Sequence, residues 1–336
     1  MTQIPATDTR LNDRFGRHVS YLRISVTDRC DFRCVYCMEE EMEFLPRQQL
    51  LTLEETAEIA AAFCRLGVTK LRVTGGEPLV RRNVLSLFHA LGSLDGLHEL
   101  TLTTNGSQLA RHAAELKRAG VKRLNLSLDT LRPERFRAIT RVGDLTQTLA
   151  GLEAALAEGF ERIKINSVIL RGRNHDEVRD LARFALQRGM DICYIEEMPL
   201  GHIGDHDRAQ AYFSSNEVLT ELSQEFDLTP TSETTGGPAR YFRVDDTDNR
   251  VGLISPHSHN FCDSCNRVRL TAEGRLLLCL GQEHSVDLKH VVRAHPGDRK
   301  RLEQAIVEAM KIKPKGHDFN LQGEPVILRH MNATGG

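Results

Sequence analysis

The sequence predicts an α/β protein: an incomplete (β/α)6 barrel of the TIM type, with a C-terminal α+β region that closes the barrel. Six strand-like segments alternate with helical segments, and this rhythm stops at about Thr231. Strands that alternate with helices form a parallel sheet with right-handed crossovers. Polar or reactive residues follow nearly every strand. In a barrel these strand ends meet at one face, whereas an open sheet binds its ligand at a single crevice, so the polar ends favour the barrel.

The six strands are short apolar or alternating runs, and we place them at 21–26, 70–74, 99–104, 122–128, 162–170 and 191–197. Helices are predicted after them at 52–67, about 83–92, up to Gly120, around 145–158, 174–189 and near 215–225. The first helix carries the clearest signals, because Thr52 can cap it, Glu55 lies three residues on, and Gly67 can end it.

The chain after residue 230 has a different pattern. Its strand-like pieces are at 240–244, 250–254, 267–271 and 275–280, and a basic helix follows near 298–312. We therefore divide the chain into residues 1–230, the partial barrel, and residues 231–336, the C-terminal region. The basic helix is expected to pack on the surface rather than to bind nucleic acid, since the net charge of the chain is only −2.

Composition fits a globular protein of 336 residues with a full core, because 40% of the residues are hydrophobic and 27% are charged. The near-neutral charge gives no sign of a nucleic-acid or membrane partner. No apolar run is long enough to span a bilayer, and the N-terminal segment lacks the apolar core of a secretion signal. We therefore expect a cytoplasmic protein.

Cysteine placement is the strongest functional signal in the chain. Six of the eight cysteines form two groups of three, which are Cys30, Cys34 and Cys37, and Cys262, Cys265 and Cys279. In a reducing compartment, clustered cysteines bind metal or take part in catalysis more often than they form disulfides. Cys64 lies on an apolar helix face and Cys193 in a strand, so both are expected to be small buried side chains.

Each group has three thiols, and that number is informative. A 4Fe–4S cluster is normally held by four thiolates, so three leave one iron free to bind something else, as a catalytic site requires. The alternative is a zinc site with its fourth ligand elsewhere. Cys30 and Cys34 are spaced for zinc, but Cys37 makes a triplet too tight to wrap easily around one ion. His257, His259 and His284 flank the second group and are not expected to be ligands.

The loop RCDFRCVYCM (29–38) resembles the signature of the radical S-adenosylmethionine (SAM) enzymes, with Tyr36 directly before Cys37. The GGEP turn at 75–78 resembles a second motif of the same superfamily. The resemblance implies that the open iron binds SAM and that an electron from the cluster cleaves it to methionine and a 5′-deoxyadenosyl radical.

Further motifs resemble a narrower family, the GTP 3′,8-cyclases of molybdenum cofactor biosynthesis (the MoaA family). They are RISVTDRCDFRCVYCM (23–38), LRVTGGEPLVRR (71–82), LTTNG (102–106), LNLSLDTL (124–131), FCDSCNRVRLTAEGRLLLCL (261–280) and the closing Gly335-Gly336. The similarity runs from about Phe15 to the last residue.

This resemblance implies a reaction and its partners. The family converts GTP to (8S)-3′,8-cyclo-7,8-dihydroguanosine 5′-triphosphate: the radical removes the ribose 3′ hydrogen, and the sugar radical attacks C8 of guanine. The implied cofactors are two 4Fe–4S clusters and SAM. The implied partners are GTP, a reductant protein of the flavodoxin or ferredoxin type and the downstream cyclic pyranopterin monophosphate synthase, with neither nucleic acid nor membrane. The expected assembly is a monomer or a homodimer.

The resemblance also implies roles for individual residues. The implied ligands of the first cluster are Cys30, Cys34 and Cys37. Those of the second cluster, whose open iron would bind guanine, are Cys262, Cys265 and Cys279. SAM contacts fall to Tyr36, Gly76, Ser127 and Met198. GTP contacts fall to Arg23, Arg72, Thr103, Lys164, Arg267, Val268 and Arg269. Arg267, Arg269, Gly335 and Gly336 are the implied catalytic residues.

The residues themselves support a dispersed triphosphate site. The chain has no Walker motif (GxxxxGK followed by Ser or Thr), so a P-loop NTPase is not expected. Arg23, Arg72 and Lys164 lie on different predicted strands that converge in a barrel, and arginine suits phosphate because its planar fork donates two bonds. The family resemblance includes the closing Gly335-Gly336, and glycine, having no Cβ, can pass close to a ligand. On these two grounds we expect the tail to thread into the barrel.

The sequence leaves two other classes of protein open. One is a different radical SAM enzyme with an auxiliary cluster, such as a peptide-modifying enzyme, although those usually carry more C-terminal cysteines. The other is an electron carrier or a zinc-stabilised binding protein, although a ferredoxin would hold each cluster with four cysteines.

Overall fold

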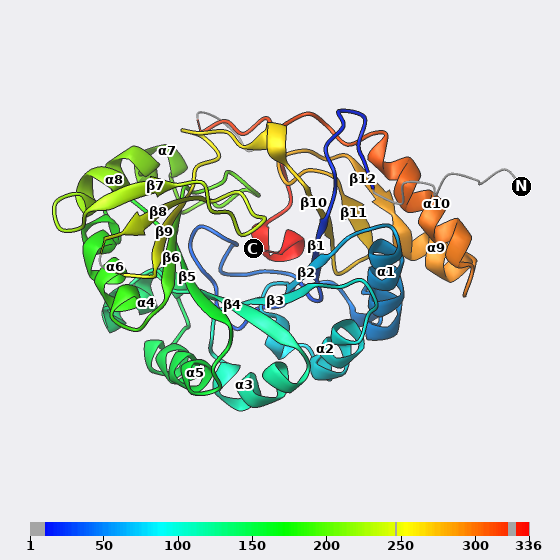
Figure 1. Ribbon diagram of the computed structural model, residues 1–336, viewed down its shortest axis with the longest axis horizontal. Coiled ribbons are helices and arrows are strands. Elements are labelled where there is room, and N and C mark those ends of the chain that lie inside the picture. Colours follow the sequence, from blue (N-terminus) through cyan, green and yellow to red (C-terminus); the bar gives the residue numbers. More distant parts are fainter. Residues whose placement is uncertain (1–10, 246, 322–326, 336) are drawn as a thin grey trace, which may run out of the picture.

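The computed structural model describes residues 11–245, 247–321 and 327–335. Across these ranges, twelve strands form one continuous curved sheet in the order β12-β11-β10-β1-β2-β3-β4-β5-β6-β9-β8-β7 (Figure 1). The strands are β1 (Tyr21–Ser25), β2 (Lys70–Thr74), β3 (Glu99–Thr104), β4 (Val121–Ser127), β5 (Arg162–Val168), β6 (Asp191–Ile195), β7 (Leu228–Thr231), β8 (Arg240–Val244), β9 (Arg250–Ile254), β10 (Arg267–Leu270), β11 (Arg275–Leu277) and β12 (Ser285–Asp287).

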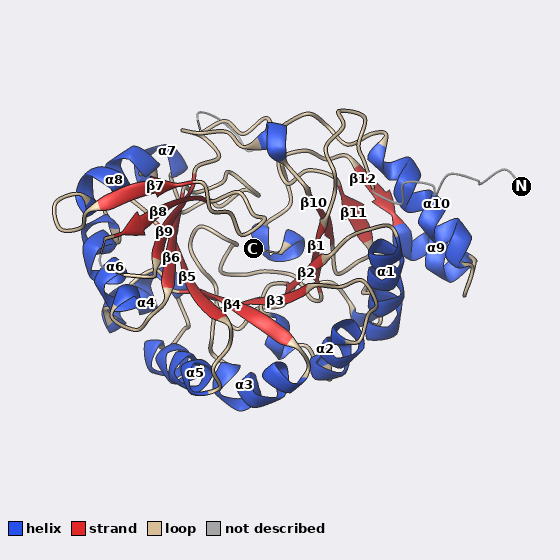
Figure 2. Cartoon of the chain, in the orientation of Figure 1, coloured by secondary structure: helices blue, strands red, loops and turns tan. Residues whose placement is uncertain are grey.

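Most of the helices cover the convex side of this sheet, as Figure 2 shows, and the short last helix lies inside the barrel. They are α1 (Leu53–Arg65), α2 (Val84–Gly92), α3 (Leu109–Arg118), α4 (Pro133–Thr140), α5 (Leu145–Ala157), α6 (Val178–Leu186), α7 (Arg208–Ala211), α8 (Ser215–Leu222), α9 (Leu288–Ala294), α10 (Arg299–Met310) and α11 (Met331–Thr334). The sequence did not predict α4, α7, α9 and α11. Among the described residues, none of the helices is long and apolar enough to cross a membrane.

The predicted incomplete barrel is confirmed. Strands β1 to β6 are all parallel to their neighbours, and the sheet ends at β12 on one side and β7 on the other instead of closing on itself. Apolar side chains such as Leu22, Ile24 and Leu71 alternate along the strands and are buried against the helices. The alternating polar set therefore points into the barrel.

The first helix begins and ends as the sequence predicts. Thr52 Oγ1 accepts a hydrogen bond from the Glu55 backbone N–H at 3.1 Å, and the Glu55 carboxylate accepts one from the Thr52 N–H at 2.8 Å. Such a cap stabilises a helix by about 1 kcal/mol. Gly67 follows the helix at φ +91°, a conformation that costs glycine little.

The C-terminal region is attached at both edges of the barrel. Strand β9 pairs with β6 and strand β10 pairs with β1, both in parallel. These pairings satisfy the backbone groups that β1 and β6 would otherwise expose at the ends of the sheet. The short helix α11 then returns the chain to the middle of the barrel, where Figure 1 places the C-terminus. Residues far apart in the sequence therefore surround one interior.

Candidate active site

One cavity inside the barrel is lined by all six clustered cysteines. Cys30, Cys34 and Cys37 lie on the loop that follows β1, and Cys279 lies just after β11. All six are free thiols of intermediate exposure. Cys64 and Cys193 are buried away from this group, as predicted.

The first cysteine loop is tied to the end of β3. The carboxylate of Asp31, next to Cys30, accepts hydrogen bonds from Asn105 Nδ2 at 2.7 Å and from Ser107 Oγ at 2.6 Å. The backbone N–H of Cys37 donates to the carbonyl of Cys34 at 2.9 Å, which makes the loop compact. Burial raises the pKa of the Cys37 thiol to about 12.

The GGEP turn packs directly against the same loop. A Cβ on Gly76 would lie 2.4 Å from the carbonyl oxygen of Arg29, so glycine is required for this close approach. The Glu77 carboxylate is fully buried and accepts hydrogen bonds from Thr104 Oγ1 at 2.9 Å and from the Asn105 N–H at 2.7 Å. Burial raises the pKa of Glu77 to about 8. Glu77 therefore fastens the turn after β2 to the end of β3.

Tyr36 connects the cysteine loop to two further strand ends. Its hydroxyl donates to Asp129 Oδ2 at 2.7 Å, and Asp129 Oδ1 accepts from the Val168 backbone N–H at 2.8 Å. Burial raises the pKa of Asp129 to about 6. The loop is thus held by contacts with the ends of β3, β4 and β5, which fixes the three thiols against the barrel.

The second cysteine group is surrounded by cations. The ammonium of Lys313, a residue only 1% exposed, lies 3.8 Å from Cys265 Sγ and donates to the Leu278 carbonyl at 2.7 Å. Burial works against ionisation of Cys265, but Arg267 and Lys313 outweigh it and lower its pKa to about 7. Arg17 Nη1 donates to the carbonyl of Cys262 at 2.8 Å.

Five cationic side chains and Tyr21 form two rows across the interior of β10, β1 and β2. Strand register aligns Arg267, Tyr21 and Lys70 in one row. It aligns Arg269, Arg23 and Arg72 in the next row. These positions alternate along each strand, so both rows face the cavity.

Tyr21 and Thr103 hold Arg72 in place. Arg72 Nε donates to the Tyr21 hydroxyl, and Arg72 Nη1 donates to Thr103 Oγ1 at 3.1 Å. Burial opposes ionisation of Tyr21, but Arg72, Arg23 and Lys70 overcome it and lower the pKa of Tyr21 to about 7. Burial lowers the pKa of Arg23 to about 10. This pattern is that of a site with excess positive charge.

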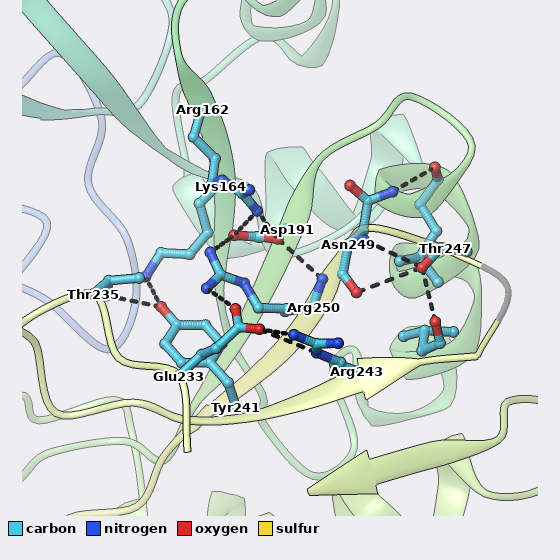
Figure 3. A network of polar contacts seen from close by, with 12 residues as sticks. Arg162, Lys164, Asp191, Glu233, Thr235, Tyr241, Arg243, Thr247, Asn249 and Arg250 are labelled. Atoms are coloured by element: carbon cyan, nitrogen blue, oxygen red, sulfur yellow. Dashed lines mark hydrogen bonds and ion pairs between the residues drawn. The ribbon is translucent and has the colours of Figure 1, made fainter. Parts of the chain in front are cut away.

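Lys164 on β5 adds a further cation to the two rows, and Figure 3 shows its surroundings. Lys70, in the first row, is likewise held by hydrogen bonds. Lys164 Nζ donates to the Tyr241 hydroxyl at 3.2 Å. Lys70 Nζ lies 2.8 Å from the carboxylate of Glu99 and donates to the Thr235 carbonyl at 2.7 Å. Both lysines are buried, and both line the cavity.

The C-terminal tail enters the barrel, as the sequence predicted. Arg269 Nη1 donates to the carbonyl of Gly335, and the Asn332 side chain donates to the carbonyl of Asp28 at 2.8 Å. Gly335 has φ +79°, and a Cβ there would lie 2.3 Å from Thr74 Cγ2. Gly336 lies outside the described residues.

The cavity brings together the cysteines and nearly all of the other predicted residues. Its lining includes Arg23, Tyr36, Arg72, Gly76, Thr103, Ser127, Lys164, Met198, Arg267, Val268 and Arg269. Val268 differs in orientation: it is 1% exposed and packs in the core on the face opposite its two arginine neighbours, so its backbone is what faces the cavity. Sequence reasoning assigned no role to Tyr21, Lys70 or Tyr241. The positions of Tyr21 and Lys70 could have been inferred from the sequence, since each lies two residues before a predicted cation on the same strand.

The residues present fit an iron–sulfur cluster with SAM beside it. Thiols are the donors that such clusters require, and three of them lie on one short loop in the cavity wall. Asn166 Oδ1 is buried without a hydrogen-bond partner in the described structure, and Asn166 lines the cavity beside Ser127. A polar ligand would satisfy it. No group of three His, Cys, Asp or Glu side chains in the described ranges could hold a single metal ion.

Comparison with known proteins defines the class first. The Radical SAM superfamily model matches residues 24–185, and the Molybdenum Cofactor Synthesis C model matches residues 190–319. In fold, the chain is similar to SuiB of Streptococcus suis in its crystal structure bound to S-adenosylmethionine, with a TM-score of 0.62 and 13% identity over 95% of this chain and 79% of that one. The three-cysteine loop in an incomplete parallel barrel is therefore that of a radical SAM protein.

Close relatives then define the family. The chain is 60% identical over 327 residues to the GTP 3′,8-cyclase of Pseudomonas entomophila, covering 97% of this chain and 98% of that protein. It is 56% identical over 329 residues to the GTP 3′,8-cyclase of Saccharophagus degradans, covering 98% and 99%. The chain belongs to the GTP 3′,8-cyclase family.

Proposed function

We propose that this protein converts GTP to (8S)-3′,8-cyclo-7,8-dihydroguanosine 5′-triphosphate in molybdenum cofactor biosynthesis, using SAM and two 4Fe–4S clusters. The observation that carries the proposal is the shared cavity. Both cysteine triplets line it, together with the buried cations Lys70, Arg72 and Lys164. A cofactor that generates radicals and a polyanionic substrate would thus meet in one enclosed space. Family membership supports the same reaction.

The cofactor side of the site is assigned to the first cysteine loop. Cys30, Cys34 and Cys37 would hold a cluster, and SAM bound to its open iron would supply the 5′-deoxyadenosyl radical. Tyr36 and Gly76 would shape the SAM pocket: the tyrosine is fixed by Asp129, and the glycine leaves room for the backbone to approach closely. Ser127 and Met198 lie in the same cavity lining and are proposed to contact SAM.

The substrate side is assigned to the cationic rows. Arg72 and Lys164 are buried and come from separate strands, so they can bind different phosphates of one triphosphate. We add Lys70, which is buried beside Arg72 on the same strand face. Arg23 is the partner of Arg72 in the strand register, and Thr103 Oγ1 accepts a 3.1 Å hydrogen bond from Arg72. Because these side chains are already positioned, binding would require little reorganisation.

The second triplet is proposed to hold an auxiliary cluster that binds guanine. Cys262, Cys265 and Cys279 line the same cavity, and Arg267 lies beside them. Lys313 supports this assignment, because a buried ammonium next to Cys265 Sγ would offset the negative charge of a thiolate-bound cluster. The proposed division of labour therefore assigns SAM chemistry to residues 1–230 and guanine binding to residues 231–336.

Arg269 and the tail are proposed to act beside the substrate. Arg269 reaches the Gly335 carbonyl, so the tail would orient this guanidinium during the reaction. Gly336 is included in the proposal from the sequence alone.

The remaining partners follow from the chemistry. The first cluster needs an electron, for which we propose a flavodoxin-type or ferredoxin-type protein, and the product would pass to a cyclic pyranopterin monophosphate synthase. Eight free cysteines, six of them clustered, suit a reducing compartment, and we propose the cytoplasm. A monomer or a homodimer is proposed for the assembly.

A peptide-modifying radical SAM enzyme is the alternative reaction class. The likeness to SuiB concerns the fold, at 13% identity, whereas the GTP 3′,8-cyclases are 56–60% identical over nearly the whole chain. The test is an anaerobic incubation of the reconstituted protein with SAM, dithionite and GTP, followed by mass spectrometry. The proposal expects 5′-deoxyadenosine together with an isomer of GTP. Cleavage of SAM without any GTP isomer would refute it.

A further inference from the structure

Lys164 has an unusual environment for a buried charge. It is 6% exposed and faces the cavity from the middle of β5. Removing an ammonium from water costs several kcal/mol unless other groups compensate. Asp191 is next to Lys164 in the strand register, but its carboxylate is engaged by Arg162 at 3.1 Å and Arg250 at 2.9 Å. Lys164 forms no ion pair with a carboxylate of the described residues, and its hydrogen bond goes to the Tyr241 hydroxyl at 3.2 Å.

The Tyr241 hydroxyl is a junction between the two buried lysines. Because an ammonium can only donate, Tyr241 accepts from Lys164, and its own O–H is free to donate to Thr235 Oγ1, 3.1 Å away. The backbone carbonyl of the same Thr235 accepts from Lys70 Nζ at 2.7 Å. One phenol therefore connects Lys164 on β5, through the loop before β8, to Lys70 on β2. Figure 3 shows Lys164, Tyr241 and Thr235 side by side.

The ring of Tyr241 is itself held firmly. The Arg250 guanidinium lies 4.8 Å from the ring centroid, in the range of a cation–π contact. Arg250 cannot swing away easily, because it is bound to Asp191 at 2.9 Å and to Glu233 at 3.0 Å. On the neighbouring strand, a Cβ on Gly252 would lie 2.9 Å from Tyr241 Cε1, so the ring packs tightly against this glycine. Tyr241 is 2% exposed and is absent from the described lining of the cavity.

We propose that Tyr241 is a positioning residue for the triphosphate: through its hydroxyl it fixes the ammonium of Lys164 and the Thr235 loop that contacts Lys70. This inference rests on the proposed binding of GTP in the cavity. Tyr241 does not touch the substrate. It keeps two cations at a fixed separation before the triphosphate arrives, so that binding requires less ordering of long side chains. The hydroxyl thus contributes to substrate affinity and not to the radical step.

The test compares two tyrosines that are equally buried on adjacent parts of the sheet. Tyr241→Phe removes the junction and keeps the ring on Gly252 and under Arg250. Tyr194→Phe is the matched control: Tyr194 is 1% exposed on β6, and its hydroxyl donates to the Val178 carbonyl at 2.6 Å on the helix side. Both changes remove one buried hydroxyl and should cost similar stability.

Steady-state kinetics of the reconstituted enzymes should separate the two. Loss of a hydrogen bond to a charged group predicts a KM for GTP that rises about tenfold in Tyr241→Phe with kcat nearly unchanged, the pattern of lost ground-state binding. Tyr194→Phe should retain the KM of the unaltered enzyme. An unchanged KM in Tyr241→Phe, or an equal rise in both variants, would overturn the inference.

Equilibrium binding gives a second readout that does not depend on turnover. Tyr241→Phe should bind GTP more weakly than the unaltered protein does. Its affinity for guanosine should be unchanged, because guanosine has no phosphate to contact the lysines. Thr235→Val, which removes Oγ1 and retains the carbonyl that contacts Lys70, should weaken GTP binding in the same direction by a smaller factor. Equal losses for GTP and guanosine would contradict a role in triphosphate binding. Failure of the unaltered protein to cyclise GTP would refute the proposed reaction, while this binding comparison would still decide the role of Tyr241.

Discussion

Replacing Gly335 with alanine tests whether the tail acts inside the barrel. Gly335 has φ +79°, where an alanine costs roughly 1–2 kcal/mol. Its Cβ would also lie 2.3 Å from Thr74 Cγ2, and overpacking of this kind costs roughly 1–3 kcal/mol. The two costs together are about 2–5 kcal/mol. The charged hydrogen bond from Arg269 to the Gly335 carbonyl contributes only roughly 1.5–3 kcal/mol.

The alanine thus costs about as much as the Arg269 contact contributes, or more. We therefore expect Gly335→Ala to fold, to bind iron normally and to displace the tail from Arg269. A disturbance of about 2 kcal/mol or more in the active arrangement corresponds to a loss of cyclisation of at least about 30-fold. The assay is kcat/KM for the GTP isomer, measured beside iron content and thermal unfolding.

Two further variants isolate the cause. Gly172→Ala changes a glycine at φ +75° that has nothing within 4 Å of the added Cβ, so it introduces the backbone strain alone and should retain activity. Thr74→Ser removes the methyl group that the Cβ added at position 335 would meet, so Gly335→Ala combined with Thr74→Ser should recover part of the lost rate. Full activity of Gly335→Ala with normal iron content would refute the proposed role of Gly335 in the reaction.

The other predictions concern the two cysteine groups and Tyr21. Cys34→Ser should abolish cleavage of SAM, because the first cluster loses one of its three thiolates; normal formation of 5′-deoxyadenosine would refute the ligand assignment. Cys265→Ser should still cleave SAM yet lose cyclisation of GTP, and undiminished cyclisation would exclude the second group from the site. Neighbouring cations lower the pKa of Tyr21 to about 7, so its contribution to folding stability is fully present above pH 10 or so and is lost as the pH falls through about 7. Subtracting the tyrosinate absorbance of Tyr21→Phe from that of the unaltered protein isolates the titration of Tyr21, which should have its midpoint near pH 7. GTP should move this midpoint to higher pH, because its phosphates offset the cations. A midpoint near pH 10 without GTP would contradict the charge arrangement.

The parts of the fold that depend on local patterns could be predicted from the sequence. Each barrel strand is a short apolar run, and the helix at Thr52 has both partners of its capping box within four residues. The cysteine triplets and the GGEP turn are also local, and their convergence follows from the rule that parallel strand ends meet at one face. The tail could be placed because the family resemblance extends to the closing glycines.

Contacts set by distant pairing could not be predicted in the same way. Lys164 and Tyr241 are 77 residues apart, and they meet because β9 joins the edge of β6 and brings β8 beside it. Nothing in either local segment specifies that pairing. Lys70 and Val268 are different, because strand alternation alone places Lys70 on the face of Arg72 and directs the Val268 side chain away from the cavity.

The proposed reaction begins with removal of the 3′ hydrogen from the ribose of GTP. GTP carrying deuterium at the ribose 3′ position should be incubated anaerobically with the reconstituted protein, SAM and dithionite, and the 5′-deoxyadenosine should be analysed by mass spectrometry. We expect 5′-deoxyadenosine with one deuterium, formed together with an isomer of GTP that has lost the label. Unlabelled 5′-deoxyadenosine, or a GTP product that retains the deuterium, would contradict this reaction.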